Sequence, residues 1–390
     1  MFKIQTLNSI SNEINKALDA QNFSIANEVD SPDGIILRSF NMHDMELDSN
    51  LKAIARAGAG VNNIPVDSCT EKGIVVFNSP GANANAVKEL VLCTMLMATR
   101  NVLESIAWTN SLSGGGDSVV KDVEKGKGAF VGHELKGKTI GIIGLGAIGS
   151  KLADTCLALG MQVVGCDPYL TVPTALGLSS SIKVVASEKE VIKDADFISV
   201  HVPLTAETRD KFNDEFIANC KEGVIILNMS RAELADAEAI KAGIASGKIA
   251  KYVVDFPTDN LIGEKNVILT PHLASGTYEA EDNCAIMASQ ELRDYLINGN
   301  ITNSVNFPAC TLGDLSTTAR LCVIHKNQPT IINQITGQVS ENHINIDNMI
   351  SKNRGEYAYT MLDICEVMSD EMTANLSKID GVVSLREIVK

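Results

Sequence analysis

Residues 139–167 read TIGIIGLGAIGSKLADTCLALGMQVVGCD, and this stretch decides the fold. Its opening run, TIGII, is short, rich in isoleucine and followed at once by glycine, which predicts a buried strand. Apolar residues then recur at helical spacing as far as Gly160, a typical residue at the C-terminal end of a helix. A second apolar run ends on Asp167. The stretch therefore predicts a strand, a tight turn, a helix and a second strand, the repeating unit of an α/β fold with a parallel sheet.

The turn in this unit carries Gly144, Gly146 and Gly149, in the G-x-G-x-x-G spacing of dinucleotide-binding proteins. In that motif the first glycine permits the tight turn, the second lets the backbone approach a pyrophosphate, and the third lets the helix pack closely on the strand. Asp167 lies where a carboxylate accepts hydrogen bonds from the ribose hydroxyls and repels a 2′-phosphate. A purely structural turn is the alternative, but the complete context of strands, helix and acidic residue favours NAD binding.

The composition is typical of a large folded protein that stays in the cytoplasm. At 390 residues the chain is long enough for two or three domains, and 45% of its residues are hydrophobic. We find no transmembrane run and no signal peptide, so we expect neither membrane insertion nor export. The nine cysteines form no CxxC pair, which favours reduced thiols over disulfides or a metal site. A net charge of −15 argues against binding to nucleic acid or to acidic membranes.

Residues 1–98 predict a second α/β domain with a parallel sheet of its own. Two of its apolar strands end in arginine: GIIL precedes Arg38 and Ser39, and AIA precedes Arg56. Because ligands collect at the carboxyl ends of parallel strands, we expect the two arginines to grip one anion together. A solvated strand end is the alternative for either arginine alone.

Two connecting segments of this part of the chain carry further predictions. The polar loop at 78–85, NSPGANAN, suits the lining of a substrate cleft, and equally the N-terminal cap of the helix that follows. Residues 101–137 are rich in glycine and polar residues, which predicts a crossover between domains with mobile parts.

Further strands of the second domain also end in polar or charged residues. Three such residues at or after the strand ends suit hydride transfer between a hydroxy acid and NAD. Arg231 offers a fixed guanidinium fork for a carboxylate. His272 is a natural base, because histidine changes its charge near neutral pH. Asp259 is the nearest carboxylate able to orient the imidazole and stabilise its charged form. Alone, each is more often a surface ion pair or an ordinary loop residue; together, after an NAD motif, they favour catalysis.

Five segments carry a resemblance to one family. They are RAGAGVNNI from Arg56, ELKGKTIGIIGLGAIG from Glu134, HVPLT from His201, NMSRAE from Asn228 and TPHLASGTYEAE from Thr270. On these motifs the chain resembles the D-isomer-specific 2-hydroxyacid dehydrogenases over residues 38–281. Within that family it is most similar to the enzymes that oxidise 3-phospho-D-glycerate to 3-phosphohydroxypyruvate, the first step of the phosphorylated route to serine.

The resemblance implies a role for each matching residue. Arg231 binds the substrate and activates its carbonyl, His272 is the acid and base, and Asp255 faces the nicotinamide amide. The implied substrate-binding positions are Arg38, Ser39, Arg56, Gly58 and Asn83. The implied NAD-binding positions are Gly144, Gly146, Ala147, Ile148, Gly149, Asp167, His201, Val202, Pro203, Thr208, Asn228, Met229, Ser230, Asp255, His272 and Ala274.

One departure from the family pattern concerns the partner of His272. The family normally places a glutamate there, in a segment of the form VFxxEP, whereas this chain reads DFPTDN and offers Asp259. An aspartate is one methylene shorter. Either the loop therefore lies closer to the histidine, or the pair is weaker.

Residues 320–390 alternate in the order βαββαβ, which predicts a ferredoxin-like unit. This unit resembles an ACT domain, a small module that senses amino acids. Similar modules in this enzyme family bind serine between paired domains, and the matching positions here are His325, Asn327 and Asn345. An ACT fold retained only for oligomerisation is the alternative.

The predicted organisation is two doubly wound, Rossmann- or flavodoxin-like parallel-sheet domains and a C-terminal ACT domain. Residues 1–98 and 285–305 form the substrate domain, 99–284 the NAD domain and 318–390 the ACT domain. The predicted reaction is NAD-dependent oxidation of 3-phospho-D-glycerate, with feedback by L-serine and no metal. Two alternatives stay open: a dehydrogenase for another D-2-hydroxy acid, and a non-catalytic, NAD-sensing interaction protein. The family also suggests homo-oligomers, either dimers or tetramers.

Overall fold

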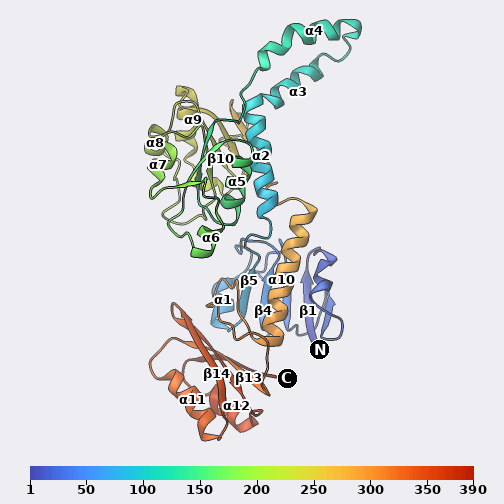
Figure 1. The fold of residues 1–390 in the computed structure, drawn as a ribbon. Helices are drawn as coiled ribbons and strands as arrows, with labels where there is room; N and C mark the ends of the chain where they lie inside the picture. Colours follow the sequence, from blue (N-terminus) through green and yellow to red (C-terminus); the bar gives the residue numbers. More distant parts are fainter. The chain divides into compact units, whose positions relative to one another are not determined.

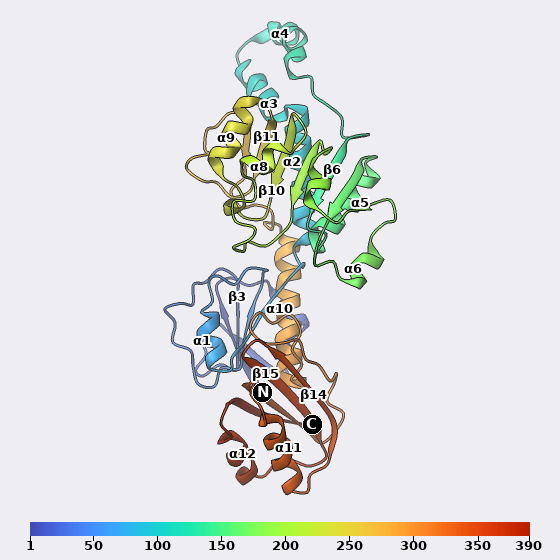
Figure 2. The same ribbon diagram turned by 90° about the vertical axis from the view of Figure 1, so that its left-hand side faces the viewer.

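A computed structural model describes residues 1–390, which gather into two compact units. The first unit contains Met1–Asn83 and Tyr278–Lys390, and the second contains Ala84–Thr277. Two parallel sheets and one antiparallel sheet make up the fold (Figures 1 and 2), which confirms the predicted class. No single helix is long and apolar enough to cross a membrane, and one pair of helices reaches that composition only with a bend of 62°.

The second unit is built on a seven-stranded parallel sheet, in the order β12-β11-β10-β9-β6-β7-β8. Its strands are β6 (Thr139–Ile143), β7 (Gln162–Cys166), β8 (Lys183–Val184), β9 (Phe197–Val200), β10 (Val224–Asn228), β11 (Ile249–Val254) and β12 (Val267–Leu269). Helices α2 (Ala84–Arg100) and α5 (Ala147–Ala158) bury one face of this sheet. The other face lies under α7 (Glu188–Ile192), α8 (Asp214–Ala218) and α9 (Ala237–Ser246). Because both faces are covered, strands such as TIGII and VIILN are apolar except for Thr139 and Asn228 at their ends.

Residues 101–137 are largely helical, and the mobility of this crossover stays a prediction. Helices α3 (Val102–Ser111) and α4 (Val119–Gly126) stand away from the sheet of their own unit in Figure 1, and neither contains a buried residue. The Trp108 ring packs on that of Phe130, with their centroids 5.2 Å apart. The glycines that suggested mobility are concentrated in the short turn between the two helices. A further short helix, α6 (Val172–Gly177), follows β7.

The N-terminal sheet of the first unit is also parallel, with the order β2-β1-β3-β4-β5. Its strands are β1 (Phe2–Leu7), β2 (Phe23–Ala26), β3 (Gly34–Leu37), β4 (Ala53–Arg56) and β5 (Val75–Asn78). Helix α10 (Tyr278–Asn298) covers one face, and α1 (Val66–Glu71) lies on the other. A short 3-10 helix, Asn12–Lys16, follows β1, and the Ser11 hydroxyl caps its N-terminus.

The residues after α10 dock against the edge of this sheet. The Val305 N–H donates to the Val76 carbonyl (2.9 Å). The Asn306 side chain accepts from the Val76 N–H and donates to the Ile74 carbonyl, both at 2.9 Å. β5 is an edge strand whose backbone would otherwise be unpaired on that side, and this segment supplies the partners.

The C-terminal residues form the predicted βαββαβ unit. Its antiparallel sheet has the order β14-β15-β13-β16, with β13 (Ala319–Lys326), β14 (Ile346–Arg354), β15 (Tyr357–Ile364) and β16 (Val382–Val389). Helices α11 (Ile331–Glu341) and α12 (Asp370–Ser377) cover one face. The opposite face, which includes Ile324, Tyr359 and Met361, packs against Tyr295 and Phe307 in the core of the first unit.

This packing shifts the boundaries expected from the sequence. The C-terminal domain shares one compact unit with the N-terminal sheet, because the two bury a common apolar core. Helix α2 lies in the second unit, where its residues Val87, Val91 and Met95 pack on the nucleotide-domain sheet. The division therefore falls at Asn83 and Tyr278, rather than at 98 and 285.

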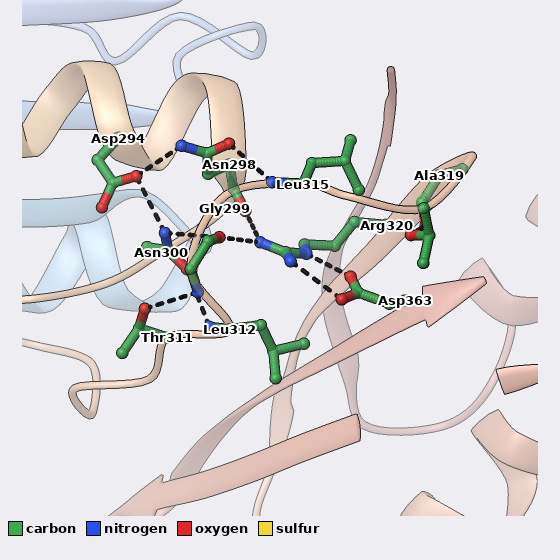
Figure 3. A network of polar contacts seen from close by, with 12 residues as sticks. Asp294, Asn298, Gly299, Asn300, Thr311, Leu312, Leu315, Ala319, Arg320 and Asp363 are labelled. Carbon is green, nitrogen blue, oxygen red and sulfur yellow. Dashed lines mark hydrogen bonds and ion pairs between the residues drawn. The ribbon is translucent and has the colours of Figure 1, made fainter. Parts of the chain in front are cut away.

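Side chains from the C-terminal sheet cap the C-terminal end of α10 (Figure 3). The Arg320 guanidinium, fully buried, donates to the carbonyls of Asn298 (2.7 Å) and Gly313 (2.8 Å). It also forms a two-point ion pair with Asp363, at 2.5 and 3.1 Å. Around it, the Asp294 carboxylate accepts from the Asn298 and Asn300 amides. The last carbonyls of a helix have no partner within the helix, so this network satisfies groups that burial would otherwise leave unpaired.

We expect Arg320→Ala to destabilise the first unit strongly. The substitution leaves the Asp363 carboxylate buried without a counter-ion, a loss of about 3–5 kcal/mol. Thermal unfolding followed by circular dichroism should show a midpoint lowered by about 6 °C or more. The control is Arg354→Ala, which removes one exposed hydrogen bond to the Ser304 carbonyl. Equal midpoints for the two variants would contradict the role of the buried pair.

Candidate active site

The glycine-rich turn lies at the point where the order of the second unit's sheet reverses. β6 has β9 on one side and β7 on the other, so the loops after β6 and β9 leave the sheet in different directions and open a crevice. The two loops are tied together, because the His201 N–H donates to the Ile143 carbonyl (2.8 Å). Gly144 has φ +92°, and a Cβ there would lie 2.5 Å from the His201 carbonyl oxygen. Only glycine fits this turn.

The other two glycines have different surroundings, which fit a bound dinucleotide. A Cβ at Gly149 would lie 2.0 Å from the Gly144 carbonyl oxygen, so this glycine lets α5 pack on the turn. A Cβ at Gly146 would meet nothing within 4 Å, although Gly146 is the N-cap of α5. Space beside the first N–H groups of a helix suits a phosphate. The Asp167 carboxylate accepts from the backbone N–H of Leu145 and of Tyr169 (both 2.9 Å), which orients it at the end of β7.

Several residues predicted to bind NAD also shape the loops around this crevice, and their contact with NAD stays a prediction. The Asn228 side chain is fully buried and donates to the Arg231 carbonyl (2.8 Å) and the Tyr252 hydroxyl (3.1 Å). The Ser230 hydroxyl donates to the Val200 carbonyl (2.9 Å), and the Thr208 hydroxyl donates to the Pro203 carbonyl (2.7 Å). Met229 and Ala274 lie in the apolar core, on which Ile148 packs, whereas Ala147 and Pro203 are exposed and Val202 is half-buried.

His201, at the start of the loop after β9, is neutral at pH 7. Desolvation lowers the pKa of its imidazole to about 4. One ring nitrogen lies 2.9 Å from the Ser199 hydroxyl, and the other is buried without a partner. This histidine therefore adds no charge to the crevice.

Asp255 holds the loop that carries His272. Its carboxylate is fully buried and accepts from the Thr270 hydroxyl (2.6 Å) and the backbone N–H groups of Leu273 (2.7 Å) and Ala274 (2.8 Å). The His272 N–H donates to the Asp255 carbonyl (2.9 Å). These bonds fix His272 at φ +54°, a left-handed conformation that is uncommon for a residue other than glycine. The geometry makes Asp255 an organiser of the loop, a function that the family resemblance does not imply.

Phe256 brings the two main catalytic candidates together. The His272 ring packs against the Phe256 ring, with centroids 4.5 Å apart, and the Arg231 guanidinium carbon lies 5.5 Å from the centroid of the same ring. Arg231 also donates to the Ser230 carbonyl (2.6 Å). The Arg231 guanidinium and the His272 ring therefore lie beside one aromatic ring, which attracts the arginine's positive charge.

Asp259 lies on the exposed part of the same loop, and no hydrogen bond or ion pair joins it to His272. The neighbouring Thr258 hydroxyl bonds to Asn260 (2.7 Å) rather than to the aspartate. The pairing of Asp259 with His272 stays a prediction. Phe256, which directly follows Asp255, is the neighbour of His272 that sequence reasoning missed.

In the first unit, the side chain of one arginine predicted to bind an anion reaches the backbone of the other. The Arg56 Nε donates to the Arg38 carbonyl (3.0 Å), and the Arg38 guanidinium forms an ion pair with Glu281 of α10 (2.5 Å). Gly58 makes room for Arg56, since a Cβ at this position would lie 2.4 Å from the arginine's terminal nitrogen. Ser39 is exposed beside Arg38, and Asn83 is half-buried at the end of this segment.

The residues predicted to bind an effector do not form one cluster within the C-terminal domain. His325 is buried, with its ring nitrogens 2.8 Å from the Lys326 carbonyl and from the Thr360 hydroxyl. Asn327 is exposed next to the start of β15, whereas Asn345 is exposed next to its end, beside Cys365. The strand separates the two asparagines.

Comparison with known proteins assigns the chain to a family. Residues 92–274 match the family described as D-isomer specific 2-hydroxyacid dehydrogenase, NAD binding domain. The D-3-phosphoglycerate dehydrogenase of Haemophilus influenzae is 32% identical over 341 residues, which cover 84% of this chain and 78% of that protein. The chain belongs to the D-isomer-specific 2-hydroxyacid dehydrogenase family. Its second unit is accordingly an NAD-binding domain, and NAD is its cofactor.

Two further relatives show how much of each protein the similarity covers. The D-3-phosphoglycerate dehydrogenase of Methanocaldococcus jannaschii is 38% identical over 280 residues, or 70% of this chain, and the match spans only 51% of that protein. The NAD+-bound 3-phosphoglycerate dehydrogenase of Entamoeba histolytica superposes with a TM-score of 0.60 at 25% identity, over 78% of this chain and 98% of that one.

The surroundings of the glycines predict opposite outcomes for two alanine substitutions. We expect Gly146→Ala to fold normally, because its Cβ meets nothing within 4 Å, but to weaken NAD binding about tenfold or more by filling the space beside the helix N-terminus. Gly149→Ala should instead lower stability by about 1–3 kcal/mol, because its Cβ would collide with the Gly144 carbonyl. Calorimetric NAD titration and thermal unfolding measure the two effects. Unchanged NAD affinity in folded Gly146→Ala would contradict the assignment.

Proposed function

We propose that the protein oxidises 3-phospho-D-glycerate to 3-phosphohydroxypyruvate with NAD, the reaction named for its relatives. The observation that carries the proposal is the placement of Arg231 and His272 on one Phe256 ring, beside the strand ends of an NAD-binding sheet. NAD supplies the hydride acceptor. The cytoplasm is the compartment that we expect for this reaction.

Each residue of this group has a task in the proposed reaction. His272 takes the proton of the C2 hydroxyl, and its exposed ring is accessible for this. Arg231 holds the substrate carboxylate and stabilises the charge that develops on the carbonyl oxygen. Asp255 keeps His272 in place through the loop bonds described above. Arg38, Ser39 and Arg56 of the first unit hold the phosphate, with the two arginines joined through the Arg38 carbonyl.

Absorbance of NADH on addition of phosphohydroxypyruvate, pyruvate or glyoxylate tests this function directly. We expect the fastest oxidation with phosphohydroxypyruvate, and a loss in kcat/KM of about 10²–10⁴-fold in His272→Asn, which lacks the acid and base. The matched variant is Asp259→Asn, on the exposed loop between β11 and β12. A shifted pH profile of kcat/KM in that variant would support its pairing with His272, and an unchanged profile would remove Asp259 from the catalytic group.

Two other functions remain to be separated from this one by the same assay. A preference for pyruvate or glyoxylate would indicate a dehydrogenase for another D-2-hydroxy acid. Absence of NADH oxidation with all three acids would indicate an NAD-sensing interaction protein. The contact of the Arg56 side chain with the Arg38 backbone supports the phosphorylated substrate, because it holds two arginines next to each other, and a pure sensor has no need for an anion site.

We further propose that the C-terminal domain is an ACT domain that binds L-serine between two copies of the chain. The βαββαβ order and the antiparallel sheet support this assignment. Because Asn327 and Asn345 lie at opposite ends of β15, one domain cannot present both to a ligand as small as serine. A site that uses both asparagines therefore requires paired domains and a homo-oligomer, a dimer or a tetramer.

Titration of the enzyme with L-serine at millimolar concentrations tests this second proposal. We expect inhibition of the wild type and an inhibitory concentration raised about tenfold in Asn327→Ala and in Asn345→Ala, each of which loses a hydrogen bond to the ligand. Asn353→Ala, an exposed asparagine of β14, is the control and should behave as the wild type. A wild type that serine does not slow would favour an ACT fold used for oligomerisation alone.

A further inference from the structure

Glu281 forms an ion pair with the Arg38 guanidinium, the group that is expected to hold the substrate phosphate. It lies in the first turn of α10, and its carboxylate oxygen is 2.5 Å from an Arg38 terminal nitrogen. Both side chains are more than one third exposed, so solvent and ligands can reach the pair. No other ion pair involves Arg38.

The charges around this pair form one compact group within the first unit. Arg38 and Arg56 both act to lower the pKa of the Cys284 thiol, and Glu281 acts to raise it, which places all three near this buried cysteine. Desolvation is the larger effect, and it leaves the pKa of Cys284 raised. Two arginines and one carboxylate therefore give a local net charge of one positive unit, in a chain whose overall charge is −15.

We propose that Glu281 is a specificity-determining residue that sets the strength with which the Arg38 and Arg56 site holds a phosphate group. This inference rests on the proposed function for the identity of the substrate. A phosphate dianion can displace Glu281 from Arg38, because it carries about twice the charge of a carboxylate and accepts more hydrogen bonds. The displaced carboxylate is exposed and can be hydrated. A substrate without a phosphate leaves the Arg38–Glu281 pair intact.

The phosphate group and the Glu281 carboxylate therefore compete for Arg38, and this competition sets the affinity for phosphate. Each phosphate that binds must replace an existing ion pair, so its net gain is smaller than that from two unpaired arginines. Weakly bound anions such as free phosphate are held less strongly as a result. Removal of the Glu281 charge should then strengthen the binding of every phosphorylated ligand and leave unphosphorylated ones unaffected.

The test compares Glu281→Gln with the wild type and with Glu279→Gln. Glu279 lies in the same helical turn, is exposed and forms no ion pair, so its substitution removes the same charge without freeing Arg38. We expect Glu281→Gln to lower the KM for 3-phosphohydroxypyruvate about three- to tenfold, as for a partly screened ion pair. The KM for glyoxylate should change less than twofold in either variant. Calorimetric titration with inorganic phosphate should show a parallel decrease in Kd for Glu281→Gln alone.

Three results would overturn the inference. An unchanged KM for phosphohydroxypyruvate would mean that Glu281 does not compete, and a raised KM would mean that it aims Arg38 at the substrate instead. Equal effects of both glutamine variants would mean that only the change in overall charge matters, and not the ion pair between Glu281 and Arg38. If the wild type reduces none of the acids, the proposed function fails, but the phosphate titration still decides: equal Kd values in the wild type and Glu281→Gln would contradict the inference by themselves.

Discussion

The first unit depends on the capping of one helix end in the protein interior. Helix α10 ends at Asn298, with Gly299 in a left-handed conformation (φ +75°), and its final carbonyls point into the C-terminal domain. Arg320 binds the Asn298 carbonyl, Arg386 binds those of Tyr295 and Leu296, and the Tyr359 hydroxyl binds that of Gly299. Two cations at the negative end of the helix dipole are favourable as well as necessary, because water is excluded there. The C-terminal sheet is thus part of the core that completes α10.

The same helix carries Glu281 in its first turn, so one rigid element holds both the proposed anion site and the C-terminal domain. A helix of 21 residues spans about 30 Å, and α10 packs on the N-terminal sheet along this length. An ACT domain joined by a free linker could turn without disturbing the substrate domain. Here the apolar face of the C-terminal sheet packs on α10, and Arg320 and Arg386 bind its last carbonyls. The proposed effector residues and the arginines proposed to bind an anion are therefore parts of one compact unit.

The regular features of this protein could be read from its sequence, because they depend on local patterns. Apolar runs ending in glycine located β6 and its turn, and the alternation after residue 320 located the C-terminal domain. Features that depend on distant partners could not be read. His325 looks like a ligand in the sequence, but the Thr360 hydroxyl and the Lys326 carbonyl enclose it. Arg386 has no acidic partner: its two terminal nitrogens donate to helix carbonyls 90 and 91 positions away, and its buried Nε has no partner.

Asp255 shows that residues at strand ends predict where a site lies better than they predict the role of each residue in it. An acidic residue directly after a strand of an NAD-binding sheet predicts a ligand of the cofactor, and Asp255 has this position after β11. Its carboxylate instead accepts three hydrogen bonds from the loop that carries His272. A histidine held at φ +54° needs such restraint, because an unrestrained loop would relax to a commoner conformation and move the ring away from Phe256. The position of the proposed base therefore rests on a buried acid that need not touch the substrate, and only the fold reveals these loop bonds.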